Sequence, residues 1–120
     1  MVALDLDYRI AFDLAPVGLI LSRRRLMVDC NQHVLAMFGA QRAQLIGQSF
    51  EVLYPSHAEF ERTGARIAAS LDRAGRYADD RVMKRLTAPA GQETLFWCHV
   101  SGRALDPADP HAAGIWSFDD

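Results

Sequence analysis

Apolar positions at the start of the chain follow helical spacing and predict a helix over residues 3–14. One face of this helix is apolar, with positions at i, i+4, i+7, i+8 and i+11: Leu4, Tyr8, Ala11, Phe12 and Ala15. Pro16 ends the segment, because the residue before a proline is driven away from helical backbone angles. We therefore expect an N-terminal flanking helix within residues 1–15, followed by a domain over residues 16–120.

A period of two replaces the helical spacing in residues 17–22 and 26–31, which predicts a hairpin of two strands. In the second strand, Leu26, Val28 and Cys30 alternate with Met27, Asp29 and Asn31, as in a half-buried strand. Three arginines, residues 23–25, lie at the turn. They have two interpretations, a phosphate-binding patch and a solvated turn, and we favour the turn because charged residues are common there.

Helical signals return after this hairpin. Asn31 is a suitable N-cap for a short helix that carries Val34, Leu35 and Phe38 on one face, and Gly39 suits its end. Short helical segments are then expected over residues 41–46 and from residue 49 to residue 53.

The strongest helical signal covers residues 56–74. Ser56 and Glu59 form a capping-box pattern at its start, and Gly75 follows its last turn. Its apolar stripe consists of Phe60, Gly64, Ile67, Ala68 and Leu71. Because two of these side chains are small, we expect the helix backbone to pack close to a sheet.

Three further strands are predicted over residues 80–86, 94–104 and 114–118. Alternation in the middle one places Trp97, His99 and Ser101 on one face and Phe96, Cys98 and Val100 on the other. Helices and strands are segregated along the chain rather than alternating, which predicts an α+β fold with an antiparallel sheet.

Composition restricts the function. The 120 residues suit one domain, and 50% hydrophobic with 23% charged residues is typical of a globular core. A net charge of −2 argues against a dedicated nucleic-acid binder, and no apolar run has the length of a membrane span. Cys30 and Cys98 do not make a disulfide framework. With no secretory signal at the start, we expect a cytoplasmic protein.

The predicted order of elements resembles that of a PAS domain: two strands, short helices, one long helix and three strands. Local sequences support the resemblance. FDLAPVGL, residues 12–19, is similar to the start of the PAS fold, and LIGQSF, residues 45–50, looks like its "LiGrsf" turn. GIWSFDD, residues 114–120, resembles the fifth strand before the "DIT" exit, although the usual "kDG" turn is absent from residues 86–93.

This resemblance implies a five-stranded antiparallel sheet with helices on one face and a ligand cavity under the long helix. The residues expected to line the cavity are Val28, Leu35, Phe38, Leu53, Phe60, Ile67, Val82, Trp97, His99 and Trp116. Two interpretations of His99 stay open, an inward imidazole that orients a ligand and an outward, solvated one. For Trp97 and Trp116, ligand stacking and plain core packing are both open, and we favour core.

The same resemblance implies a homodimer, because the leading helix of many PAS domains builds one. That helix would present Leu4, Tyr8, Ala11 and Phe12 to a partner copy. In the PAS strand order, two strands separate Cys30 from Cys98, so we expect two buried thiols rather than a disulfide.

We expect neither haem nor covalent flavin. Haem-binding PAS domains place a histidine inside the long helix, whereas His57 stands at its exposed start. In the light-sensing relatives a reactive cysteine occupies the position of Phe50. The histidines and cysteines show no metal-ligand spacing, and the sequence carries no nucleophile elbow, phosphate loop or dinucleotide fingerprint, so we expect no enzyme.

Two functions remain in view. The first is a small-molecule-sensing PAS domain of a cytosolic bacterial signalling protein, for which we favour a transcriptional regulator of the LuxR type whose output domain lies outside this chain. The second is a ligand-independent dimerisation module of a diguanylate cyclase or histidine kinase.

Overall fold

The computed structural model describes the backbone of residues 2–120 and the side chains of residues 7–120. A first helix and a hairpin open the chain: α1 (Val2–Leu14), β1 (Gly18–Arg23) and β2 (Leu26–Cys30). Short helices follow: α2 (Gln32–Phe38), α3 (Arg42–Leu45) and the 3₁₀ turn η1 (Phe50–Leu53). The long helix and the last strands complete it: α4 (His57–Ala74), β3 (Arg76–Lys84), β4 (Leu95–Ala104) and β5 (Ala113–Asp119).

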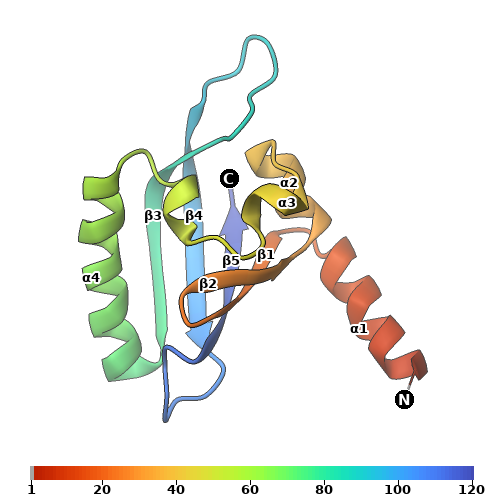
Figure 1. Ribbon diagram of the computed structural model, residues 1–120, viewed down its shortest axis with the longest axis vertical. Coiled ribbons are helices and arrows are strands. Elements are labelled where there is room, and N and C mark those ends of the chain that lie inside the picture. Colours follow the sequence, from red (N-terminus) through yellow and green to blue (C-terminus); the bar gives the residue numbers. More distant parts are fainter. Residues whose placement is uncertain (1) are drawn as a thin grey trace.

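The strands form one antiparallel sheet in the order β2-β1-β5-β4-β3. Figure 1 shows α4 lying along β3, at one edge of the sheet, and α2 and α3 near β1 and β2, toward the opposite edge. This is the α+β arrangement that the sequence predicts. Helix ends also follow the predicted signals: the Ser56 hydroxyl accepts a hydrogen bond from the Glu59 amide, and Gly75 ends α4 in the left-handed conformation.

A β-bulge changes the predicted faces of β2. Leu21 pairs with Asp29 and Ser22 pairs with Met27, so Val28 is an extra residue without a partner on β1. The bulge turns both Met27 and Cys30 into the core and leaves Val28 39% exposed. The predicted strict alternation of Leu26, Val28 and Cys30 on one face is therefore wrong.

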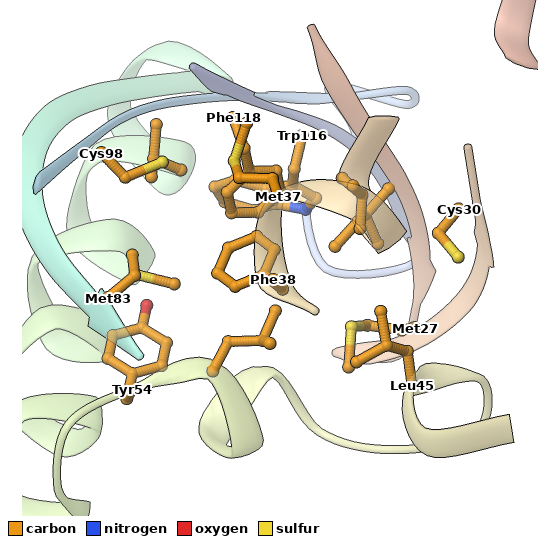
Figure 2. Packing of buried hydrophobic residues seen from close by; sticks show 14 of the residues in the cluster. Met27, Cys30, Met37, Phe38, Leu45, Tyr54, Met83, Cys98, Trp116 and Phe118 are labelled. Atoms are coloured by element: carbon orange, nitrogen blue, oxygen red, sulfur yellow. The ribbon is translucent and has the colours of Figure 1, made fainter. Parts of the chain in front are cut away.

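The core fills the space between the sheet and α2, α3 and η1. Figure 2 shows Phe38 in the middle of this cluster, between Tyr54 on one side and Phe118 on the other. The Phe38 and Phe118 ring centroids lie 5.7 Å apart in an edge-to-face arrangement. Cys30 and Cys98 lie at opposite ends of the cluster, and both thiols are free and buried, as expected.

Helix α1 projects away from the rest of the domain (Figure 1). Its attachment is polar. The Asn31 side-chain amide donates to the Phe12 carbonyl over 2.9 Å, and Asp29 forms ion pairs with Arg9 of α1 and Arg42 of α3. Along α1, Tyr8 and Leu14 are 68% and 73% exposed. A few polar contacts therefore hold a helix whose apolar side chains are largely exposed over residues 7–14, the part of α1 with described side chains.

Candidate ligand-binding cavity

A cavity of about 360 Å³ lies between α4 and the inner face of the sheet. Its apolar walls come from both layers: Phe60, Ile67 and Leu71 from α4, Met83 and Val100 from β3 and β4, and Trp116 and Phe118 from β5. This volume falls within the range of small-molecule sites, and the walls are mostly apolar, as such sites are.

The cavity exists because α4 stands off the sheet. The helix is tied at its ends, where the Ala104 amide donates to the Gly75 carbonyl and the Tyr54 ring packs edge to face on Phe60. In its middle turns, Gly64 and Ala68 contribute almost no side-chain volume. A Cβ atom added to Gly64 would meet only an Arg25 nitrogen, at 3.5 Å. Instead of the predicted close packing of the helix backbone, the small residues leave open space.

Trp116 is fixed in the wall by three contacts. Its indole nitrogen donates to the Ser22 hydroxyl over 3.1 Å, and its ring packs edge to face on Phe50. The indole also covers Gly102, where an added Cβ atom would lie 2.1 Å from the ring. Trp116 is thus both core and cavity wall.

A buried polar cluster borders the cavity on the β3 side. Arg81 is 8% exposed, and its guanidinium lies near the rings of Tyr54 and Tyr77. Its Nη1 donates to the Tyr54 hydroxyl over 2.5 Å, and its Nε donates to Asp79 over 2.7 Å. The Tyr77 hydroxyl donates to the other oxygen of Asp79 over 2.5 Å. Burial raises the pKa of Tyr54, so its hydroxyl stays protonated at neutral pH.

Three charged side chains, Arg25, Glu61 and Arg103, also line the cavity, together with His111. Arg24 and Arg25 form the two-residue turn of the β1–β2 hairpin, with φ angles of 52° and 69°. Such left-handed pairs belong to the turn type that matches strand twist in hairpins. The predicted arginine turn is therefore present, and it carries Arg25 across the cavity toward α4.

Of the residues predicted to line the cavity, Phe60, Ile67 and Trp116 do so. Leu35, Phe38 and Leu53 are in the neighbouring core instead, because α2 and η1 pack directly on the sheet. Phe60 is only partly buried and lines the cavity.

Four other predicted lining residues are corrected by the structure: Val28, Val82, Trp97 and His99 point away from the cavity. Val28 is displaced by the bulge. On β4, the alternation itself is confirmed, but Cys98 and Val100 take the inner face, which leaves Trp97 70% exposed. Val82 pairs with Trp97 and lies on that same outer face. His99 takes the outward alternative, where its Nδ1 lies 2.7 Å from Asp80.

Sequence reasoning missed Arg81, Tyr54 and Ser22 as cavity residues. Charged residues on strands are usually exposed, so Arg81 gives no signal of burial by itself. A usable signal is that Tyr77, Asp79 and Arg81 fall on the same strand face as the apolar Met83. Polar side chains that share a strand face with a buried apolar residue can be buried together when they hydrogen-bond to one another.

The predicted dimer residues have mixed positions. Tyr8 and Ala11 are exposed, whereas Phe12 is half-buried with Arg9 over its ring. The side chain of Leu4 is outside the described residues. Among the side chains of residues 7–120, no group of three or more His, Cys, Asp or Glu is placed to hold a metal ion. In the same part of the chain, no helix combines the length and apolarity that a bilayer crossing needs.

Fold, cavity and sequence together define a sensory domain of the PAS class. Residues 16–120 match the family model described as "PAS domain", and the chain belongs to this family. A solved PAS domain of a LuxR-family transcriptional regulator from Burkholderia thailandensis, in complex with ethanol, is 60% identical. Its TM-score is 0.83, over 95% of this chain and 96% of that one.

Two further comparisons extend this result. The sensor protein TdiS of Thauera aromatica is 28% identical over 113 residues, which are 94% of this chain but only 20% of that protein. The chain thus spans about a fifth of the length of the sensor protein it matches. A PAS domain from Colwellia psychrerythraea shares the fold with a TM-score of 0.82 at 13% identity, covering 98% of this chain and 96% of that one.

Proposed function

We propose that this PAS domain senses a small organic molecule for a cytosolic transcriptional regulator whose output domain lies outside this chain. The observation that carries the proposal is the cavity between α4 and the sheet, at the position where the sequence predicts a ligand. The ethanol complex of the LuxR-family relative supports it, because the two chains are 60% identical.

The mechanism is differential binding. A ligand that contacts both α4 and the sheet stabilises the arrangement in which these two layers are correctly spaced. That arrangement is transmitted through elements tied to the same sheet, among them α1, which reaches β1 and α2 through Asn31. The domain acts without haem or a covalent flavin, so the purified protein is expected to be colourless.

A thermal-shift screen of small alcohols, acids and aromatic compounds tests the proposal. A ligand at one hundred times its dissociation constant adds about 2.7 kcal/mol to the free energy of unfolding, which raises Tm by several degrees. Ala68→Trp should abolish the shift by filling the cavity. Ala69→Trp, at the neighbouring exposed position on α4, should keep it.

A second function is favoured by α1, whose exposed Tyr8 and Leu14 suit a ligand-independent dimerisation module of a cyclase or kinase. Two results together would favour the dimerisation module over the sensor. No compound would raise Tm of the wild-type protein, and Ala68→Trp would raise the stability of the domain while leaving its dimerisation unchanged.

A further inference from the structure

Two polar side chains that border the α4 cavity, Arg81 and Tyr54, carry hydrogen-bond donors that have no acceptor within the described residues. Building on the sensing function proposed above, we propose that the ligand is a small organic acid whose carboxylate is received by Arg81 and Tyr54 while its apolar body fills the space under α4. This assigns both a ligand class and the residues that select it.

Arg81 supplies the first unfilled donor. Its Nη2 atom is buried and makes no hydrogen bond, although it lies 2.7 Å from Asp79 Oδ1. The same carboxylate oxygen already accepts a hydrogen bond from Nε, so Nη2 is in ion-pair contact with Asp79 but forms no hydrogen bond of its own. A buried guanidinium with an unpaired N–H is costly, so an added acceptor beside it is strongly favoured.

Tyr54 supplies the second donor. Its oxygen accepts from Arg81 Nη1, and among residues 7–120 the Tyr54 hydroxyl donates no hydrogen bond. Tyr54 is 5% exposed. Ser22 repeats the pattern on the opposite side of the cavity, since its oxygen accepts from the Trp116 indole. A carboxylate only accepts hydrogen bonds and carries two oxygens, so it matches adjacent donors better than a hydroxyl group does.

The charge around the cavity agrees with an anion. Its lining includes three arginines, Arg25, Arg81 and Arg103, against one glutamate, Glu61, in a chain whose net charge is −2. Within the described residues, no acidic group forms a salt bridge with Arg25 or Arg103. The single negative charge of Asp79 is shared between two arginines, Arg81 and Arg66, and Arg66 lies 3.8 Å from the Asp79 carboxylate. Asp79 therefore does not fully neutralise Arg81.

The volume sets the size of the acid. At about 30 Å³ per water molecule in the liquid, the cavity of about 360 Å³ holds roughly twelve water-sized groups. With its mostly apolar walls, it therefore suits a monocarboxylate of roughly six to ten carbon atoms, aliphatic or aromatic.

Matched pairs of compounds test the inference: hexanoate with 1-hexanol, and benzoate with benzyl alcohol, titrated calorimetrically into the purified domain at pH 7. We expect each acid to bind at least tenfold more tightly than its alcohol. Arg81→Gln should remove this preference, and Tyr54→Phe, which keeps the ring, should lower it severalfold. Arg73 is an exposed arginine of α4 that does not line the cavity, so Arg73→Gln should leave the preference for the acid unchanged.

The outcomes separate the two proposals. If the alcohols bind as tightly as the acids, the acid ligand is wrong and the sensing function stands. If none of the four compounds binds, both proposals are overturned for ligands of this size. An acid preference that survives both Arg81→Gln and Tyr54→Phe overturns the assigned residues. Should Arg81→Gln fail to fold, Tyr54→Phe decides, because it leaves the ion pair between Arg81 and Asp79 intact.

Discussion

At the scale of single residues, Asn31 joins more segments than any short stretch of sequence suggests. Its side-chain oxygen accepts from the amides of Leu19 and Val34, and its side-chain nitrogen donates to the carbonyls of Phe12 and Val17. The residue is fully buried and uses its hydrogen-bonding capacity to connect α1, β1 and α2. Only its role as N-cap of α2 can be predicted from local sequence.

Asn31→Ala should therefore lower the free energy of unfolding by about 2–4 kcal/mol, since it leaves buried amides and carbonyls without partners. Ser56→Ala removes a single exposed cap from α4 and should cost only about 1 kcal/mol. Urea denaturation of both variants measures the difference. Equal losses would show that the buried bonds of Asn31 contribute no more than an ordinary cap.

Cys98 gives a pH dependence. Burial raises the pKa of its thiol from 9.0 to about 11 in the folded chain. The unfolded chain therefore releases this proton first as pH rises, and the free energy of unfolding should fall by up to about 2–3 kcal/mol between pH 9 and pH 11. Urea denaturation at pH 8 and pH 11 should show a smaller fall in Cys98→Ala. Parallel pH curves for the two proteins would contradict this.

At the scale of elements, the glycines of a helix and a strand should respond to alanine in opposite ways. Gly64→Ala should stabilise α4 by about 0.5–1 kcal/mol, because the added Cβ atom meets only Arg25 at an ordinary contact distance. Gly102→Ala should destabilise by about 1–3 kcal/mol, because its Cβ atom would lie 2.1 Å from the Trp116 ring. Thermal denaturation compares the two. Loss of stability in Gly64→Ala would mean that α4 sits closer to the sheet.

The same elements show how far the sequence can predict this fold. The limits of α4 follow from local chemistry, a serine cap and a left-handed glycine, so they are predictable. The bulge at Val28 depends on the register with β1, which local sequence does not contain. Alternation along β4 yields two faces but does not say which one the helices cover, so the sequence cannot show that Trp97 lies on the outer face. Arg81 is buried only because Asp79 and Tyr54 lie beside it in space.

At the scale of the whole molecule, α1 is mostly exposed over the residues whose side chains are described, 7–14. Its exposed apolar side chains, Tyr8, Ile10 and Leu14, are on a helix that projects from the domain (Figure 1). A second copy that packs on this helix would remove that apolar surface from water, which is the main driving force of association.

We therefore expect a homodimer that depends on α1. Sedimentation should find the wild-type chain as a dimer and the double variant Tyr8→Glu/Leu14→Glu as a folded monomer. Leu105→Glu, at another exposed apolar position far from α1 in sequence, is the control and should stay dimeric. A monomeric wild-type chain at high concentration, or a dimeric double variant, would assign the interface elsewhere.

The two edges of the sheet are not equivalent. Along β2, the bulge interrupts the ladder, and the outer backbone groups of Met27 already bond to Gly47 and Gln48. β3 carries nine residues, Arg76–Lys84, and no described strand pairs with its outer edge. An extended peptide that joins this sheet, or a second molecule that aggregates with it edge to edge, therefore has one place to add a strand. Alternating charges at Arg76, Asp80 and Lys84 oppose indiscriminate pairing there.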